Sequence, residues 1–187
     1  KYENDFTKNN FFVFEAGKTL FLEGDWVKLS QLLNNKKPEL AQDFSIYAQH
    51  RPPNLSHYVA VGVNYITQKN DQLSLAVPLL VADLFICPIK NQLFSIDLGF
   101  SAYGSGDLQV KVGTPKKRFI GSIFGAGPKL NIRIFPNKFI GFHISARYQY
   151  YRILNLNNLE IPGTNNTISL DEFNNASVLV GFSVQLM

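Results

Sequence analysis

A strict alternation of residue types is the feature that most constrains how this chain can fold. Between residues 140 and 150, one set of alternate positions is apolar or aromatic: Ile140, Phe142, Ile144, Ala146, Tyr148 and Tyr150. The positions between them are small or polar: Gly141, His143, Ser145, Arg147 and Gln149. Because successive side chains of a strand point to opposite faces, this period of two predicts a strand with one apolar and one polar face.

The same alternation recurs at 96–102, 124–134 and 177–186. Four noisier segments, 11–23, 43–50, 58–68 and 73–87, are also typical of extended structure. Pro78 lies within the last of these and predicts a bulge or an irregular pairing, because proline cannot donate to a strand ladder. Lys18 falls on the apolar face of the first segment, which predicts a bulge or register change near Gly17. Together these segments predict eight strands.

The predicted connections between the strands alternate in length. Residues 52–54, 90–91 and 136–138 form tight turns, whereas 27–42, 105–117 and 155–174 are long loops and 69–72 is a brief one. Short turns at one end and mostly long loops at the other are typical of up-and-down outer-membrane barrels. We therefore predict an all-β fold, an eight-stranded antiparallel up-and-down transmembrane β-barrel, in which residues 1–187 form a single domain.

The composition favours a membrane barrel over a soluble one. Aromatic residues supply 13% of the chain and charged residues only 17%, whereas charged residues make up about 25% of a typical soluble domain. The longest uncharged apolar run, 73–82, is far shorter than the roughly 20 residues of a membrane-spanning helix, so any crossing must use strands. The polar face is rich in glycine, which suits a crowded barrel interior. A soluble lipocalin-like barrel, which would turn its apolar face inward, is the alternative.

Two further groups of residues fit a membrane barrel. Aromatic residues gather near the predicted strand ends, as interfacial girdles require: Phe11, Phe12, Tyr65, Phe85, Phe94, Tyr103, Phe135, Phe139, Tyr150 and Tyr151. The polar face carries charges of both signs and a histidine: Glu15, Asp83, Asp97, Lys129, Arg133, His143 and Arg147. Because an unpaired buried charge is costly, we expect these seven side chains to form a polar network in the lumen.

Three short segments carry a family resemblance: Pro-Leu-Leu at 78–80, Gly-Ala-Gly at 125–127 and Ser-Ala-Arg-Tyr-Gln-Tyr at 145–150. In their order and spacing they resemble the small OmpA-type, OmpX-type and opacity-type barrels, and the resemblance covers roughly residues 56–187. It implies an eight-stranded barrel in the bacterial outer membrane. Barrels of this kind serve as anchors, adhesins and subunits of larger outer-membrane machines.

His143 and Ser145 are the sharpest candidates for catalysis, because two residues apart on a strand they share a face, as a base and a nucleophile could. The pair resembles the His-x-Ser of lipid A deacylases, which are also eight-stranded barrels. Arg147 lies on the same face, so we expect an interior hydrogen-bond network and assign no catalytic residue. His50 and His57 lack Cys or carboxylate partners at metal-ligand spacing, so we expect no metal or cofactor. The net charge of +4 lies in short clusters and does not indicate nucleic-acid binding.

The predicted loop at 27–42 is the candidate partner-binding loop, because it carries four leucines among its polar residues: Leu29, Leu32, Leu33 and Leu40. A freely solvated loop would be less apolar, so we expect a short helix that packs against a partner or across the barrel mouth. The resulting hypothesis is a non-enzymatic outer-membrane anchor, adhesin or accessory subunit, which uses its outer loops or lipid-facing wall to meet lipid and a protein partner. The alternatives are a lipid A deacylase-like enzyme, a narrow pore and a soluble ligand-binding barrel.

Overall fold

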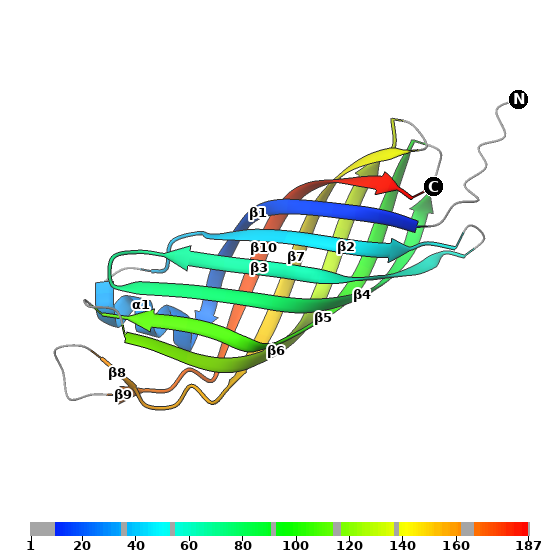
Figure 1. Ribbon diagram of the computed structural model, residues 1–187. Helices are drawn as coiled ribbons and strands as arrows, with labels where there is room; N and C mark the ends of the chain where they lie inside the picture. The colour runs from blue at the N-terminus through cyan, green and yellow to red at the C-terminus, as the bar shows by residue number, and fades with distance from the viewer. Residues whose placement is uncertain are drawn as a thin grey trace, which may run out of the picture.

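Eight long strands form a closed antiparallel barrel (Figure 1). The computed structural model describes residues 10–34, 37–52, 55–90, 93–113, 117–136, 139–161 and 167–186. The barrel strands are β1 (Asn10–Gly24), β2 (Ala41–His50), β3 (His57–Lys69), β4 (Leu73–Lys90), β5 (Phe94–Val112), β6 (Lys117–Ile134), β7 (Ile140–Leu154) and β10 (Glu172–Gln185). Each barrel strand pairs with the next barrel strand along the chain, β7 with β10 included, and β10 closes the barrel against β1. The predicted fold is confirmed.

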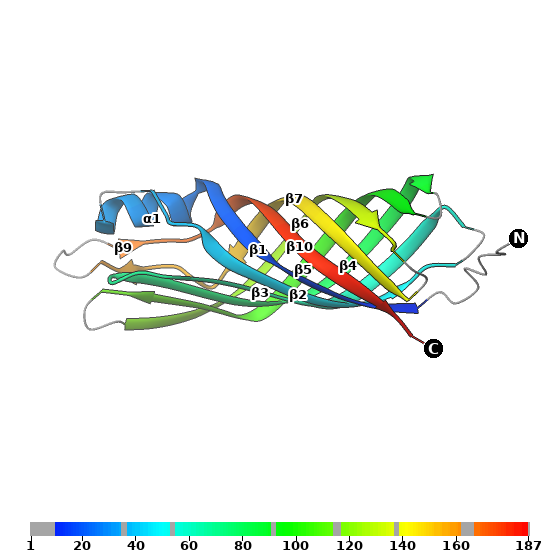
Figure 2. The same ribbon diagram turned by 90° about the horizontal axis from the view of Figure 1, so that it is seen from above.

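Three shorter elements gather at one end of the barrel, which we call the cap end (Figures 1 and 2). They are the helix α1 (Asp25–Asn34), between β1 and β2, and the paired strands β8 (Leu159–Glu160) and β9 (Thr167–Ile168), between β7 and β10. Strands β2, β4, β6 and β10 end at the opposite end, which we call the turn end, and β1 begins there. The tight turns predicted at 52–54, 90–91 and 136–138 lie mostly outside the described residues. Within the described ranges, no helix has the length and apolar character needed to cross a membrane.

The connection between β5 and β6 differs from the prediction. β5 continues to Val112 and β6 begins at Lys117, so the long loop predicted at 105–117 is wrong. A register shift between Ser105 and Leu108 exchanges the two faces of β5. Even-numbered residues point outward before this shift and inward after it, as buried Leu108 and Val110 show. Leu108, Val110 and Val112 continue the period of two through the predicted loop, and the shift changes only the face on which they lie.

Two other expected irregularities had different outcomes. The pairing of β4 with β5 is interrupted between Ala76 and Leu80, which confirms the irregularity predicted at Pro78. The irregularity predicted near Gly17 is wrong, because β1 pairs regularly on both sides until a shift that follows Phe21. Lys18 is exposed in the cap-side half of β1, where its long stem can carry the ammonium group towards the polar region.

Nearer the turn end, the barrel has an apolar outer surface and a polar interior. The exposed apolar residues there include Ile46, Val61, Leu84, Phe100, Ile132, Phe142, Ile144, Val180 and Phe182. The polar residues between them are buried inside, among them His143 and Arg147. This pattern matches the faces expected from the alternation, and a surface of this kind is suited to lipid.

At the cap end the polarity is reversed. The interior there holds apolar side chains: Leu73, Leu75, Leu108, Val110, Val112, Ile153 and Phe173. The outward positions of the same strand ends are mostly polar: Gln42, Thr67, Lys69, Ser74, Gln109, Lys111, Arg118 and Arg152. Exposed aromatic residues, including Phe44, Tyr65 and Tyr150, lie between the two zones. The wall nearer the turn end is thus compatible with lipid. The wall at the cap end has polar residues outside and apolar residues inside, as a soluble barrel has.

Glycines on the inner face make room for aromatic rings of the neighbouring strand. Gly99 lies directly opposite Phe85, and a Cβ atom on it would lie 2.3 Å from that ring. Gly125 lies opposite Tyr151 in the same way, and its Cβ would lie 2.4 Å from the tyrosine ring. Both rings are buried inside the barrel. The glycine-rich inner face therefore lets large side chains fill a narrow lumen.

Candidate functional sites in the lumen and at the cap end

The lumen holds equal numbers of buried positive and negative side chains in the described part of the chain. The four carboxylates are Glu15, Asp43, Asp83 and Asp97. The four cations are Arg51, Lys129, Arg133 and Arg147. Because a buried charge must be paired to be tolerated, this balance is what a closed lumen requires. The side chains form three connected groups.

Lys129 on β6 lies at the centre of the first group. Its Nζ atom is 3.2 Å from a carboxylate oxygen of Glu15 on β1 and 3.2 Å from one of Asp83 on β4. The same ammonium group lies 4.3 Å from the centre of the Tyr47 ring on β2, within the range of a cation–π interaction. One cation therefore connects four strands of the barrel.

The second group surrounds Asp97 near the turn end. Arg133 Nε lies 3.0 Å from this carboxylate, Tyr58 donates a hydrogen bond of 2.8 Å to it, and Arg51 lies 3.5 Å away. Arg51 also donates a hydrogen bond of 2.9 Å to the buried thiol of Cys87. These contacts link strands β3, β4, β5 and β6 across the lumen.

The third group surrounds Asp43 on β2. Arg147 on β7 forms an ion pair with this carboxylate, and the Thr19 hydroxyl donates a hydrogen bond of 2.7 Å to it. The side-chain amide of Asn64 also donates to Asp43, and Arg147 donates to the Tyr47 hydroxyl at 3.2 Å. Asp43 therefore accepts hydrogen bonds from three different strands, and all three donors lie on the inner face.

His143 and Ser145 meet at a carboxylate and not at each other. His143 Nε2 lies 3.0 Å from Glu15 Oε1, and the Ser145 hydroxyl donates a short hydrogen bond to the same oxygen. Both side chains are buried inside the barrel. For His143 to activate Ser145 as a base, it must hydrogen-bond to the serine hydroxyl. Here that hydroxyl donates to Glu15. The pair fits the interior hydrogen-bond network expected from the sequence.

The structure places all seven sequence-predicted lumen residues inside the barrel, in separate groups. Glu15, Asp83, Lys129 and His143 belong to the first group, Asp97 and Arg133 to the second, and Arg147 to the third. Sequence reasoning missed Asp43, Tyr47, Tyr58 and Arg51. Asp43 and Tyr47 alternate with the outward-facing Phe44 and Ile46, so the same period of two could have found them. Arg51 follows the end of β2, where no alternation remains to place it.

Five of the ten predicted interfacial aromatics lie inside the barrel, so that part of the prediction is wrong. The buried five are Phe11, Phe85, Tyr103, Phe135 and Tyr151, whereas Phe12, Tyr65, Phe139 and Tyr150 are exposed and Phe94 is half-buried. Position near a strand end determines how far along the barrel axis a residue lies. Whether it points inward or outward depends on its place in the alternation of the strand. Tyr150 and Tyr151 are neighbours in sequence and therefore occupy opposite faces.

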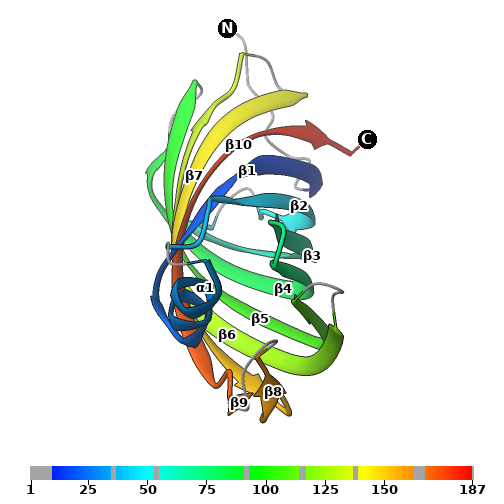
Figure 3. The same ribbon diagram turned by 90° about the vertical axis from the view of Figure 1, so that its left-hand side faces the viewer.

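The helix α1 occupies the first half of the predicted partner-binding loop and packs against the end of β1 and the start of β10 (Figure 3). Trp26 and Leu29 are 1% and 0% exposed and belong to the apolar core of the cap end, and half-buried Leu33 packs against it. Leu29 and Leu33 therefore serve the chain's own core. This corrects their assignment to a partner surface and agrees with the alternative that the helix packs on the barrel itself. Leu32 and Leu40 remain exposed, at 64% and 54%.

Asp25 ties the start of α1 to the start of β10. Its carboxylate accepts hydrogen bonds from the backbone N–H groups of Asp171 and Glu172, at 2.9 and 3.3 Å, and from Lys28 at 2.9 Å. Partial burial raises the pKa of Asp25, but the hydrogen bonds from Lys28 and the two backbone groups outweigh it, so the pKa lies below its ordinary value. The charged form of Asp25 is therefore the one that holds α1 in place.

Comparison with known proteins shows similarity at the level of the fold. No family model and no curated protein sequence matches this chain. Neisserial surface protein A has a similar structure, with a TM-score of 0.67, 10% identity, and coverage of 95% of this chain and 97% of that one. OprG from Pseudomonas aeruginosa gives a TM-score of 0.56, 10% identity, and coverage of 96% and 97%. Ail, the attachment invasion locus protein of Yersinia pestis, gives 0.55, 11%, 96% and 99%.

These similarities and the surface of the barrel lead to the same class of protein. A soluble lipocalin-like barrel would face water with its polar side, whereas here the apolar side is outside over the band nearer the turn end. The compared structures include outer membrane proteins with the same closed barrel, which confirms the resemblance expected from the sequence. The fold and the apolar outer wall together identify the chain as a small β-barrel protein of the bacterial outer membrane.

Proposed function

We propose that this protein is a non-enzymatic outer-membrane anchor, adhesin or accessory subunit that meets a protein partner through its cap end. The observation that carries the proposal is the exposure of Leu32 and Leu40 on a section whose outer surface is otherwise mostly polar. Leu20 and Leu22, on the adjoining part of β1, are exposed as well. Several neighbouring apolar side chains in a water-facing region are typical of a surface that binds another protein.

The position of these leucines supports a docking role. Thr19 on β1 pairs with Ala41 on β2. Leu20 follows Thr19 and Leu40 precedes Ala41, so both leucines adjoin the same paired position. They lie on the cap side of Phe44, an exposed ring at the edge of the apolar band. Because the chain's own core is already filled by Trp26 and Leu29, the exposed leucines are available to a partner.

The interior of the barrel favours this role over the enzymatic and pore alternatives. His143 and Ser145 are engaged with Glu15 inside the wall, away from a lipid substrate. An eight-stranded barrel has room inside only for side chains, and here the lumen contains paired charges at one level and apolar residues at the next. Small barrels also present their long connections at one end, where binding commonly occurs.

Replacement of Leu32 and Leu40 by serine tests the proposal. Leu32→Ser combined with Leu40→Ser should abolish recovery of the partner, because the apolar contact is lost while Trp26 and Leu29 stay buried. The control combines Ile120→Ser with Leu154→Ser, which removes two exposed apolar side chains from the cap-end parts of β6 and β7. Each variant would be cross-linked in intact cells and purified in mild detergent. Equal recovery of cross-linked protein by both double variants would contradict a docking role for the leucines.

A further inference from the structure

We infer that the outer wall of β2–β5 binds a phosphorylated lipid of the outer leaflet, with an acyl chain in an apolar groove and the phosphate at cations beyond the groove. The cations are Lys69, Lys111 and Arg118, which we call the cationic row. The inference rests on the membrane location of the barrel and is independent of the protein partner proposed above.

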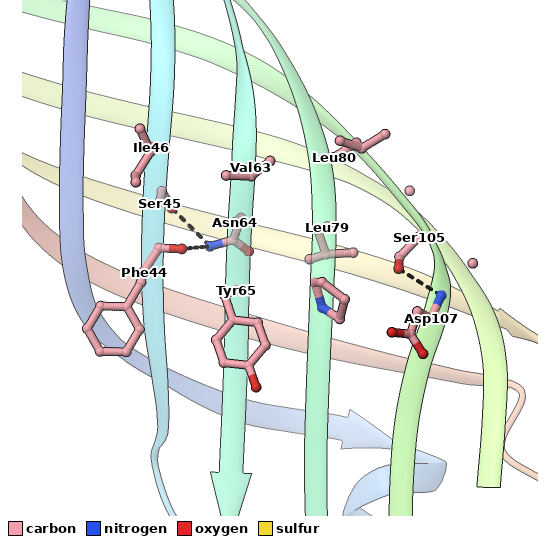
Figure 4. A pocket seen from close by; sticks show the side chains of 13 residues that line it. Phe44, Ser45, Ile46, Val63, Asn64, Tyr65, Leu79, Leu80, Ser105 and Asp107 are labelled. Carbon is pink, nitrogen blue, oxygen red and sulfur yellow. Dashed lines mark hydrogen bonds between the residues drawn. The ribbon is translucent and has the colours of Figure 1, made fainter.

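The groove lies on the outside of four neighbouring strands (Figure 4). Its volume is about 530 Å³, and its apolar lining comes from Phe44, Ile46, Val63, Tyr65, Pro78 and Leu80. Apart from Pro78, these side chains are well exposed on the wall. The groove therefore opens towards the lipid and has the apolar character that an acyl chain requires.

Irregular pairing and two glycines create this groove. The pairing of β4 with β5 is interrupted between Ala76 and Leu80, and that of β5 with β6 between Ser105 and Leu108. Gly104 and Gly106 lie in the segment of β5 that borders the groove, and a Cβ atom on either would meet no other atom within 4 Å. The absence of side chains at these two positions leaves the space open. Steric crowding does not account for either glycine, unlike the glycines of the inner face.

The cationic row lies further along the same strands. Lys69 pairs with Ser74, Ser74 with Lys111, and Lys111 with Arg118, so the three cations occupy one register row across β3–β6. Lys69 is four residues beyond Tyr65 on β3, roughly 13 Å at about 3.3 Å per residue. This distance carries the row from the apolar band into the headgroup region at the cap end. The cap end carries the longer connections, which face the outside in outer-membrane barrels, so this leaflet is the outer one.

The charges of the row lack counterions within the described part of the chain. Lys69, Lys111 and Arg118 are exposed, and none forms an ion pair with another described residue. Lys111 and Arg118 lie directly opposite each other, where like charges destabilise a strand pair. A bound phosphate would remove that repulsion. Asp107, at the groove edge, already accepts two hydrogen bonds from the Gln109 amide, at 2.9 and 3.0 Å.

The spacing of the row fits a headgroup with more than one phosphate. Neighbouring strands lie about 4.8 Å apart, so three strand spacings place Lys69 and Arg118 roughly 14 Å from each other. Lysine and arginine side chains both bind phosphate oxygens, lysine as a point charge and arginine in a bidentate manner. A nucleic acid or a water-soluble protein could not reach the groove, because its apolar lining faces the lipid. The occupant to which both features are complementary is an anionic lipid of the outer leaflet.

The experiment compares two lipids with identical acyl chains, one carrying its phosphates and one dephosphorylated. The full chain would be placed in nanodiscs containing traces of either lipid, and bound lipid would be counted by native mass spectrometry. The first variant combines Lys69→Gln, Lys111→Gln and Arg118→Gln. Its control, with the same loss of net charge, combines Lys28→Gln, Lys37→Gln and Arg152→Gln, which are exposed elsewhere at the cap end. The second variant is Gly106→Phe, which fills the groove and keeps the cations.

We expect the native protein to prefer the phosphorylated lipid. The row variant should lose that preference by a factor on the order of a hundred, because it lacks three cations that each attract an anionic headgroup. The control variant should keep the preference. Gly106→Phe should weaken binding of both lipids alike. Equal binding of the two lipids by the native protein, or equal losses in the row variant and its control, would overturn the inference. The Leu32 and Leu40 variants leave the row and the groove intact, so failure of the partner proposal would leave these results unchanged.

Discussion

At the scale of single residues, the pairing of buried charges determines the stability of the lumen. Asp43 shows the principle, since its carboxylate is fully buried and accepts from Thr19, Asn64 and Arg147. Removal of one partner from such a group leaves a charge in a site that water cannot easily reach, which costs far more than the loss of a surface contact. The expected effect therefore depends on burial and not on the charge itself.

Arg147→Ala should destabilise the barrel by about 3–5 kcal/mol, because Asp43 would be left buried without a cation. Lys37→Ala, at an exposed position, should change the free energy of unfolding by less than about 1 kcal/mol. Urea-induced unfolding in liposomes would compare the two. Adding Asp43→Asn to the Arg147 variant should recover part of the loss, since the orphaned charge is then removed. Similar losses for Arg147→Ala and Lys37→Ala would show that the lumen is hydrated.

At the scale of elements, α1 is held by a few polar contacts at its start and by apolar packing along one face. Trp26 is buried and its indole N–H donates a hydrogen bond of 2.8 Å to Gln68 on β3. Asp25 supplies the link to β10 described above. The chain has a single tryptophan, so the fluorescence of Trp26 reports the docking of α1 alone.

Acidification should release α1. The pKa of Asp25 is lowered in the folded protein, so the stabilisation that it gives is present above the unfolded value of 3.8 and is lost as the pH falls through the lower folded value. Iodide should therefore quench Trp26 weakly at neutral pH and strongly once the pH is well below 3.8. In Asp25→Ala, quenching should already be raised at neutral pH and should change little on acidification. A native-like pH response in that variant would assign the transition to another carboxylate.

At the scale of the whole molecule, side chains of two different kinds fill the lumen at two levels. The charged groups fill the lumen within the apolar band, and the apolar core with α1 fills it at the cap end. The charges are paired with one another across the lumen. Such an interior supports the outer wall and leaves binding to the outside of the molecule.

The native barrel should therefore show no steady ion conductance in a planar lipid bilayer. Ions would have to displace paired charges near Lys129 and then cross the apolar side chains around Leu108 and Val110, and an eight-stranded lumen has no spare width for either step. The measurement is single-channel recording after insertion of the refolded protein, with insertion checked by protease protection. Discrete, reproducible current steps from inserted protein would contradict the closed lumen.

The sequence by itself determined the strands and, over much of each one, the face on which a residue lies. Alternation placed Glu15, Lys129, His143 and Arg147 inside because a strand reverses the direction of its side chains at every residue, which is a local property of the backbone. It failed at the register shift after Ser105, where an inserted irregularity exchanges the faces without any mark in the pattern.

Only the tertiary structure decided which charges meet and where the barrel changes polarity. Glu15 and Lys129 are 114 residues apart, and barrel closure brings them within 3.2 Å. The apolar core at the cap end forms because strand ends far apart in sequence converge with α1, which buries Leu29 that the sequence left available to a partner. These contacts depend on strand register and closure, which are set by pairing between distant segments, whereas alternation records only which way each side chain points.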